Sequence, residues 1–206
     1  MNRTVLTTFG FGPAAAYLDI SLPTFAAYAQ HHGMDLYVPA PQRFDGLSRA
    51  CPWWKIPLLV SLLGAGYETV LWLDSDVVVR HYDKNILDDA SEAPMSMVVQ
   101  ETPDGAVPST GVWVVRETAL ESLHGLWALD GFRRSECWWE QAAVISALGG
   151  DPDAGQVFVP PGPLWGSLPY EWNPHVRDPR GAVGGRFFHA TGFDDRRAAM
   201  IENRSV

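Results

Sequence analysis

Residues 68–78, with the sequence ETVLWLDSDVV, decide how this chain folds. Residues 69–73 form a nearly continuous apolar run, which is typical of a strand buried on both faces of a sheet. Asp74 and Asp76 follow this run directly, and two carboxylates at the mouth of a buried strand cost free energy unless a cation compensates them. Residues i and i+2 of an extended backbone point the same way, so both carboxylates could face one Mn²⁺ or Mg²⁺ ion. The competing interpretation is a turn in which both side chains cap backbone N–H groups.

Segments of strand and helix character alternate around this acidic pair. Strands are expected at residues 3–9, 35–39, 69–73, 95–99, 111–116, 158–160 and 186–189. Helices are expected at 17–33, 54–63, 117–129 and 138–148, and a loop region rich in Pro, Gly and Trp at 161–185. The alternation predicts an α/β fold with a mostly parallel, twisted sheet and helices on both faces. Ligands of such sheets bind outside the carboxyl ends of the strands.

The composition excludes several classes of function. The chain has 206 residues, 47% of them hydrophobic, and a net charge of −9, so we expect one globular domain over residues 1–206. No basic run supplies a nucleic-acid-binding face. We expect no signal peptide or membrane anchor, and therefore a cytoplasmic protein. Cys51 and Cys137 lie far apart and predict reduced thiols, with neither a disulfide framework nor a zinc site.

Two classes of enzyme carry an Asp-x-Asp motif after a hydrophobic strand. One is the metal-dependent nucleotide-sugar transferases, and the other is the phosphatases of the haloacid dehalogenase type. Residues 74–78 fit the phosphatase pattern D-x-D-x-[TV], with Asp74 as nucleophile, and Asp194 and Asp195 could pass for its later acidic motif. A phosphatase carries its nucleophile on the first strand, however, whereas Asp74 follows at least two predicted strands.

The remaining motifs resemble one family group. In chain order they are residues 25–33 (FAAYAQHHG), 49–55 (RACPWWK), 109–116 (STGVWVVR), 139–143 (WEQAA) and 187–192 (FFHATG). Together with the acidic pair, this ordered set resembles the retaining glycosyltransferases with a GT-A fold. The nearest group is the galactosyl-, xylosyl- and mannosyltransferases of glycosyltransferase family thirty-four, with family eight more distant.

The resemblance implies a metal-dependent transfer of a hexosyl or pentosyl group. Asp74, Asp76 and His189 would hold Mn²⁺ or Mg²⁺, and the donor would be a nucleotide-diphosphate sugar, most commonly a UDP-sugar. Residues 1–110 would bind the nucleotide and residues 111–206 the acceptor side. The donor contacts that it implies are Thr7, Thr8, Phe9, Arg49, Lys55, Asp74, Ser75 and Gly192.

Glu140 and Gln141 are the implied catalytic residues. In related enzymes Gln141's position lies on the far face of the transferred sugar, and its acidic neighbour binds sugar hydroxyls. An uncharged amide is a poor nucleophile, so we expect front-face attack by the acceptor and retention of configuration. The acceptor itself stays open among a glycan, a lipid, a peptide and a small natural product, with Trp165 and Trp172 as its expected contacts.

The chain departs from the family pattern at three points. Ser109 stands where the family has Asn, and Glu140 stands where it has Asp. The basic residue expected shortly after the final His-x-x-Gly is not aligned, because Asp194 and Asp195 precede Arg196. These departures leave open a non-catalytic module that binds a nucleotide sugar.

Overall fold

A central six-stranded sheet organises the computed structural model, which describes residues 3–40, 50–102, 105–129, 138–154, 159–176, 178–182 and 184–204. The strand order is β2-β1-β3-β6-β5-β7. The strands are β1 (Thr4–Thr7), β2 (Asp35–Tyr37), β3 (Thr69–Leu73), β5 (Met95–Thr102), β6 (Gly105–Arg116) and β7 (Trp165–Leu168). The pairs β1–β2, β1–β3 and β5–β7 are parallel, whereas β6 runs antiparallel to β3 and β5. The mostly parallel α/β architecture is therefore confirmed.

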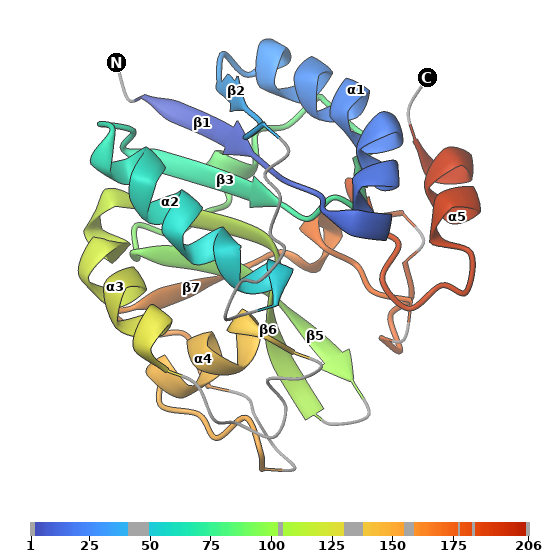
Figure 1. The fold of residues 1–206 in the computed structure, drawn as a ribbon. Coiled ribbons are helices and arrows are strands. Elements are labelled where there is room, and N and C mark those ends of the chain that lie inside the picture. The colour runs from blue at the N-terminus through green and yellow to red at the C-terminus, as the bar shows by residue number, and fades with distance from the viewer. Residues whose placement is uncertain are drawn as a thin grey trace.

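Helices cover both faces of the sheet (Figure 1). One face carries α2 (Lys55–Gly64), α3 (Leu120–Ala128) and α4 (Glu140–Ala147). The other side carries α1 (Ala15–His31), against which α5 (Arg196–Asn203) packs. A separate antiparallel pair, β4 (Val77–Val79) with β8 (Phe187–His189), lies next to α1 and α5.

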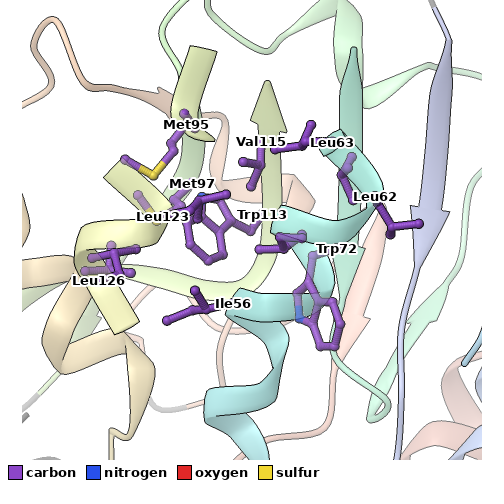
Figure 2. Close-up of a cluster of buried hydrophobic side chains, with 14 of the residues drawn as sticks. Ile56, Leu62, Leu63, Trp72, Met95, Met97, Trp113, Val115, Leu123 and Leu126 are labelled. Atoms are coloured by element: carbon purple, nitrogen blue, oxygen red, sulfur yellow. The ribbon is translucent and has the colours of Figure 1, made fainter. Parts of the chain in front are cut away.

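Strand β3 is buried on both faces, as its sequence predicts. Val70 and Trp72 join the core cluster beneath α2 and α3, around Trp113 (Figure 2). Leu71 and Leu73 join the opposite cluster, which α1 closes. Fully burying a side chain of this size contributes about 1.5–3 kcal/mol. Packing on both faces thus holds β3 in place, and it also fixes the position of its carboxyl end, after which Asp74 follows.

Two neighbouring strands are longer than the sequence indicates. Residues 105–110, expected as loop, are the first half of β6, which pairs with β5 from Thr102↔Gly105 onward. Pro108 lies opposite Val99 beyond an irregularity in the register at Met97/Val98. The hairpin carries Ser109 and Thr110 toward the carboxyl end of β3.

The interpretation of residues 161–185 as loop is wrong. This segment contains β7, which extends the sheet parallel to β5, and a 3-10 turn at Tyr170–Trp172. The expected strand at 158–160 is also wrong over Val159 and Pro160, which lie in no strand, and Phe158 lies outside the described residues. The sequence reading also missed β4 and α5 altogether.

Candidate active site

The acidic pair lies in a tight turn at the carboxyl end of β3. The backbone N–H of Asp74 donates to the carbonyl of Gly111 (2.8 Å), and the N–H of Val77 donates to the carbonyl of Asp74 (3.0 Å). The chain then enters β4. Capping is therefore done by backbone groups, which leaves both Asp carboxylates available for side-chain chemistry.

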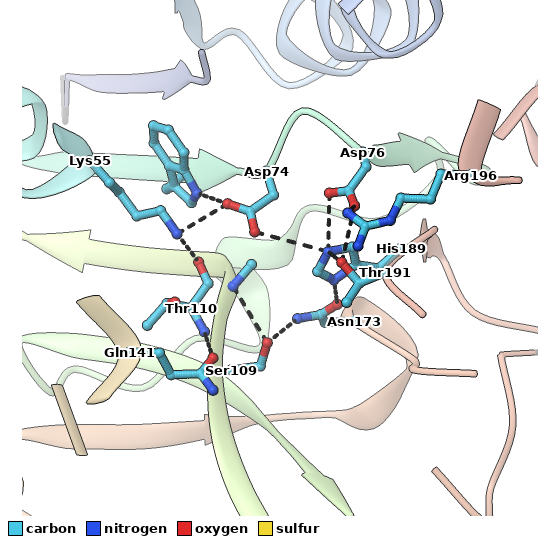
Figure 3. A network of polar contacts seen from close by, with 12 residues as sticks. Lys55, Asp74, Asp76, Ser109, Thr110, Gln141, Asn173, His189, Thr191 and Arg196 are labelled. Carbon is cyan, nitrogen blue, oxygen red and sulfur yellow. Dashed lines mark hydrogen bonds and ion pairs between the residues drawn. The ribbon is translucent and has the colours of Figure 1, made fainter. Parts of the chain in front are cut away.

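His189 reaches this turn through the β4–β8 pair. Its register partner in β4 is Val77, and the N–H of Ala190 donates to the carbonyl of Asp76 (2.9 Å). His189 Nε2 lies 3.2 Å from Asp76 Oδ1 and 3.9 Å from Asp74 Oδ2. One ligand atom from each of the three residues lies within 4.8 Å of the others. The three side chains expected to hold a metal are thus brought together (Figure 3).

In each of the two aspartates, one carboxylate oxygen is held by neighbouring side chains. Asp74 Oδ1 accepts from Trp72 Nε1 (2.7 Å) and pairs with Lys55 Nζ (3.0 Å). Asp76 Oδ2 accepts from Thr191 Oγ1 (3.0 Å) and from Arg196 Nη1 (2.9 Å). The other oxygen of each carboxylate is left facing the cluster.

Asn173 holds the imidazole of His189 in the same way, through one ring nitrogen. Its Oδ1 lies 2.9 Å from His189 Nδ1, while its Nδ2 donates to Ser109 Oγ (3.1 Å). The amide nitrogen is thus engaged elsewhere, so Oδ1 accepts from Nδ1–H and Nε2 faces the carboxylates. Two carboxylate oxygens and one imidazole nitrogen, each oriented by a neighbour, form a donor set that fits Mn²⁺.

The charges of the cluster are balanced within the protein. Burial raises the pKa of Asp76, but His189 and Arg196 lower it more, so its carboxylate stays ionised well below the usual range. Burial lowers the pKa of His189, yet the carboxylates of Asp76 and Asp74 outweigh it and the net shift is upward. The single proton of Thr191 Oγ1 goes to Asp76, and His189 Nε2 lies 2.7 Å from the same oxygen. That geometry suits a protonated imidazole.

Gly111 makes the room that His189 occupies. A Cβ built on it would lie 2.4 Å from His189 Cε1 and 3.2 Å from Asp74 Oδ2. Real Cβ atoms do not approach other atoms so closely, so a side chain at this position would displace the His189 ring. The glycine in the 109–116 motif therefore has a steric reason.

Lys55 is a buried internal cation. Its Nζ pairs with Glu140 Oε1 (2.6 Å) and Asp74 Oδ1 (3.0 Å), and it donates to the carbonyl of Thr110 (3.1 Å). Burial lowers its pKa, but the two carboxylates outweigh burial and the net shift is upward. Lys55 lines the site as expected, but as the partner of two carboxylates.

The catalytic candidates Glu140 and Gln141 begin α4 and face β6. Glu140 is 3% exposed, and its Oε1 accepts from Thr110 Oγ1 (2.9 Å) as well as from Lys55. Gln141 Oε1 accepts from the N–H of Thr110 (3.2 Å). The Glu140 Oε2 atom is buried with no hydrogen-bond partner within the described part of the chain.

These residues line a cleft of about 740 Å³. Of the predicted site residues, it takes in the following: Phe9, Lys55, Asp74, Ser75, Asp76, Glu140, Gln141 and His189. Thr7, Thr8 and Gly192 do not line it. Thr7 and Thr8 are fully buried, and Thr7 Oγ1 donates to the carbonyl of Tyr37 (2.8 Å). Arg49 lies outside the described residues.

The aromatic side chains differ from the expectation. Trp165 and Trp172, expected at the acceptor, are 2% and 0% exposed and belong to the core. Trp138 and Trp139 line the cleft instead. The indole of Trp172 donates to Asp89 Oδ2 (2.8 Å), which shows why an aromatic residue in a Pro/Gly-rich segment need not be exposed.

Sequence reasoning missed Asn173 and did not align Arg196. Nothing local marks Asn173, which follows a 3-10 turn and reaches His189 only through tertiary structure. The sequence does hold a local signal for Arg196, because Asp195 directly before it is a helix N-cap residue. Arg196 begins helix α5, which Asp195 caps by accepting from the N–H of Ala198 (2.9 Å). The helix directs its guanidinium back to Asp76 from seven positions after His189.

A solved structure resembles this chain over nearly its whole length, and others resemble it over a smaller part. The glycosyltransferase involved in glycosylation of the major capsid of PBCV-1 is 21% identical, with a TM-score of 0.74, over 97% of this chain and 99% of that one. The fold is a glycosyltransferase fold. The glycosyltransferase GlyE of Streptococcus pneumoniae TIGR4 is 13% identical, with a TM-score of 0.51, over 83% of this chain and 46% of GlyE. Neither a protein-family model nor a curated protein matches the chain.

The glycosyltransferase fold confirms the expected GT-A-like architecture. Membership of family thirty-four or family eight stays a prediction. None of the helices in the described residues has both the length and the apolar character needed to cross a membrane.

Proposed function

We propose that this chain is a metal-dependent glycosyltransferase that takes its sugar from a UDP-sugar donor and retains the anomeric configuration. The observation that carries the proposal is the Asp74–Asp76–His189 cluster, which opens into a cleft at the carboxyl end of β3 on a glycosyltransferase fold. A bound Mn²⁺ or Mg²⁺ would neutralise the diphosphate of the donor and ease its departure.

The charge of the protein supports this assignment. At −9 the chain repels an anionic donor unless cations reverse the field locally. Arg196 lines the cleft with a half-exposed guanidinium beside Asp76. Lys55 instead pairs with both Asp74 and Glu140, which offsets part of the negative charge on the donor side of the cleft.

The polar groups around α4 suit a sugar. Glu140 and Gln141 line the cleft, and the amide of Gln141 offers a dipole that needs no deprotonation. Phe9 and Phe11, with ring centroids 4.7 Å apart, line the cleft beyond the end of β1, where a nucleobase could pack.

Retention is supported by the acids that line the cleft. Within the described residues they are Asp74, Asp76 and Glu140, and all three are committed to the cluster or to Lys55. Asp151, Asp153 and Asp178 do not line it. An inverting transfer needs an independent base, so front-face attack with proton transfer to the leaving phosphate fits better.

A thermal-shift panel of UDP, GDP and ADP with and without Mn²⁺ tests the proposal. UDP at about a hundred times its Kd should raise Tm by roughly 5–10 °C, and only with the metal. Asp76→Asn should abolish the shift, whereas Asp19→Asn, the same charge change on the exposed face of α1, should not. Stabilisation by UDP that is indifferent to a chelator contradicts the proposal.

Three further measurements separate the alternatives. Mg²⁺-dependent release of phosphate from p-nitrophenyl phosphate, lost in Asp74→Asn, would favour the phosphatase. Once a product is obtained, the coupling constant of its anomeric proton gives the stereochemistry, and a β-linked product from an α-linked donor would contradict retention. UDP–Mn²⁺ binding without donor hydrolysis or transfer would favour a binding module.

A further inference from the structure

Trp139 is the one exposed tryptophan of this chain. All nine tryptophans are described, and eight of them are buried or partly buried, whereas Trp139 is 39% exposed and lines the cleft. Trp72, also in the cleft lining, is 1% exposed and its indole N–H is committed to Asp74. Trp138 packs against Val107 and Ile145. Trp139 therefore offers the cleft an indole that the core does not use.

The backbone of Trp139 is strained. Trp139 has φ 45° and ψ −122°, and it is the one non-glycine residue with positive φ among those described. Such a conformation favours glycine, and other residues hold it at a cost that is usually tied to function. If only the turn into α4 mattered, glycine would serve better. The presence of tryptophan at this strained position therefore points to a role of its side chain.

The indole lines the same cleft as the residues of the proposed donor sugar site. Trp139 directly precedes Glu140 and Gln141, whose side chains face Thr110. A group that attacks a donor sugar held there must lie beside it in the same cleft. Hydrogen-bonding side chains, Gln100 and His175, also line the cleft. An aromatic face next to such groups suits a pyranose or furanose ring, which has apolar C–H faces and a rim of hydroxyls.

We propose that Trp139 is the platform of a saccharide acceptor, so that the acceptor is a glycan or glycoside whose terminal ring stacks on the indole. The inference rests on the proposed function, whose acceptor it names. A lipid acceptor would need a contiguous apolar surface, whereas side chains that can hydrogen-bond to hydroxyls, among them Gln100, Gln141 and His175, line the same cleft as the indole.

The test measures saccharide binding by calorimetry in the presence of Mn²⁺ and UDP, without any turnover. The probes are methyl glycosides and unbranched di- and trisaccharides of common hexoses and pentoses. Trp139→Ala should weaken the best saccharide by about tenfold or more, with the UDP–Mn²⁺ affinity changed less than about twofold. Trp139→Phe should recover most of the loss. Tyr37→Ala, which removes an exposed aromatic ring outside the cleft lining, is the matched control and should change neither affinity.

The outcomes are separable from those of the proposed function. Unchanged saccharide affinity in Trp139→Ala overturns the platform, as does an equal loss of UDP and saccharide, which would assign the indole to the donor. Binding of UDP–Mn²⁺ with no saccharide bound overturns the acceptor class alone. Saccharide binding that needs Trp139 without any UDP binding supports the platform and contradicts the donor assignment. Trp139→Gly, which keeps the turn without strain, must show the same saccharide loss as Trp139→Ala, because otherwise the alanine effect is one of folding.

Discussion

The Oδ1 atom of Asn173 lies 2.9 Å from Nδ1 of His189, and this contact decides which nitrogen of the ring faces Asp74 and Asp76. Asn173 is fully buried, and Ser109 holds its amide nitrogen. Partners of this kind fix the tautomer and the orientation of a ligating histidine, and their removal commonly costs ten- to a hundredfold in metal affinity.

Replacing Asn173 should therefore weaken metal binding. We expect Asn173→Leu to lower the Mn²⁺ affinity by about 10–100-fold and to destabilise the fold by about 1–3 kcal/mol, because two buried polar groups lose their partner. Asn173→Asp keeps an acceptor for His189 Nδ1–H and for Ser109 Oγ–H, so it should retain more of the affinity. Electron paramagnetic resonance of free Mn²⁺ measures this directly. Equal affinities for both variants would contradict the orienting role.

Gly111 allows a second prediction, on steric grounds. Because an added Cβ would lie 2.4 Å from His189 Cε1, Gly111→Ala should displace the ring, lower the Mn²⁺ affinity at least about tenfold and cost about 1–3 kcal/mol of stability. Gly125, inside α3, is the matched control because a Cβ there meets no atom within 4 Å. Gly125→Ala should stabilise the protein by about 0.5–1 kcal/mol and leave metal binding unchanged. Titration calorimetry and urea unfolding check both.

The raised pKa of His189 predicts how metal binding depends on pH. In the metal-free protein, the stabilisation due to protonated His189 is fully present below the pKa of unfolded histidine, and it is lost as the pH rises through the raised folded pKa. Mn²⁺ needs the neutral imidazole, so its binding should release a proton and strengthen as the pH rises from 6 to 8. Calorimetry in buffers of different ionisation enthalpy counts that proton. Binding that is independent of pH over this range would show that His189 is no ligand.

The strain at Trp139 can be measured by comparing two truncations. Trp139→Ala and Trp139→Gly remove nearly the same packing, but only glycine adopts φ 45° without a steric penalty. The glycine variant should therefore be the more stable of the two by about 1 kcal/mol or more, against the usual advantage of alanine. Urea midpoints give the difference, and an alanine variant as stable as the glycine variant would contradict the strain.

The sequence predicted the parts of this fold that a local pattern encodes. The apolar run at residues 69–73 predicts a strand buried on both faces, and β3 has those bounds. The grouping of Asp74, Asp76 and His189 also follows the expectation, although the two Asp residues are indicated by local sequence and His189 by a resemblance. That the group holds a metal stays a prediction. The sheet edges were not predicted. β7 carries Gly166, where a Cβ would lie 2.0 Å from Ser91 Oγ, so its glycine reflects close packing instead of a loop.

The contacts that orient the cluster could not be read from the sequence for a different reason. Asn173 reaches His189 across 16 positions of the chain, and Arg196 reaches Asp76 across 120 positions. Neither pairing leaves a local pattern. The sequence also indicates Lys55, but as a cation for the donor. Its actual role depends on the burial of Glu140, which only the packing of α4 against β6 reveals.

Lys55 and Glu140 should behave as one unit in stability. Their atoms lie 2.6 Å apart with both side chains almost fully buried, so Lys55→Met leaves a buried carboxylate without its cation and should cost about 3–5 kcal/mol. Glu140→Gln added to Lys55→Met removes that charge while keeping the oxygen that Thr110 Oγ1 contacts. The double variant should then be more stable than Lys55→Met alone, with a coupling of about 1–3 kcal/mol. Urea unfolding of the three variants completes the cycle. Additive effects would mean that Asp74, the second partner of Lys55, carries the interaction instead.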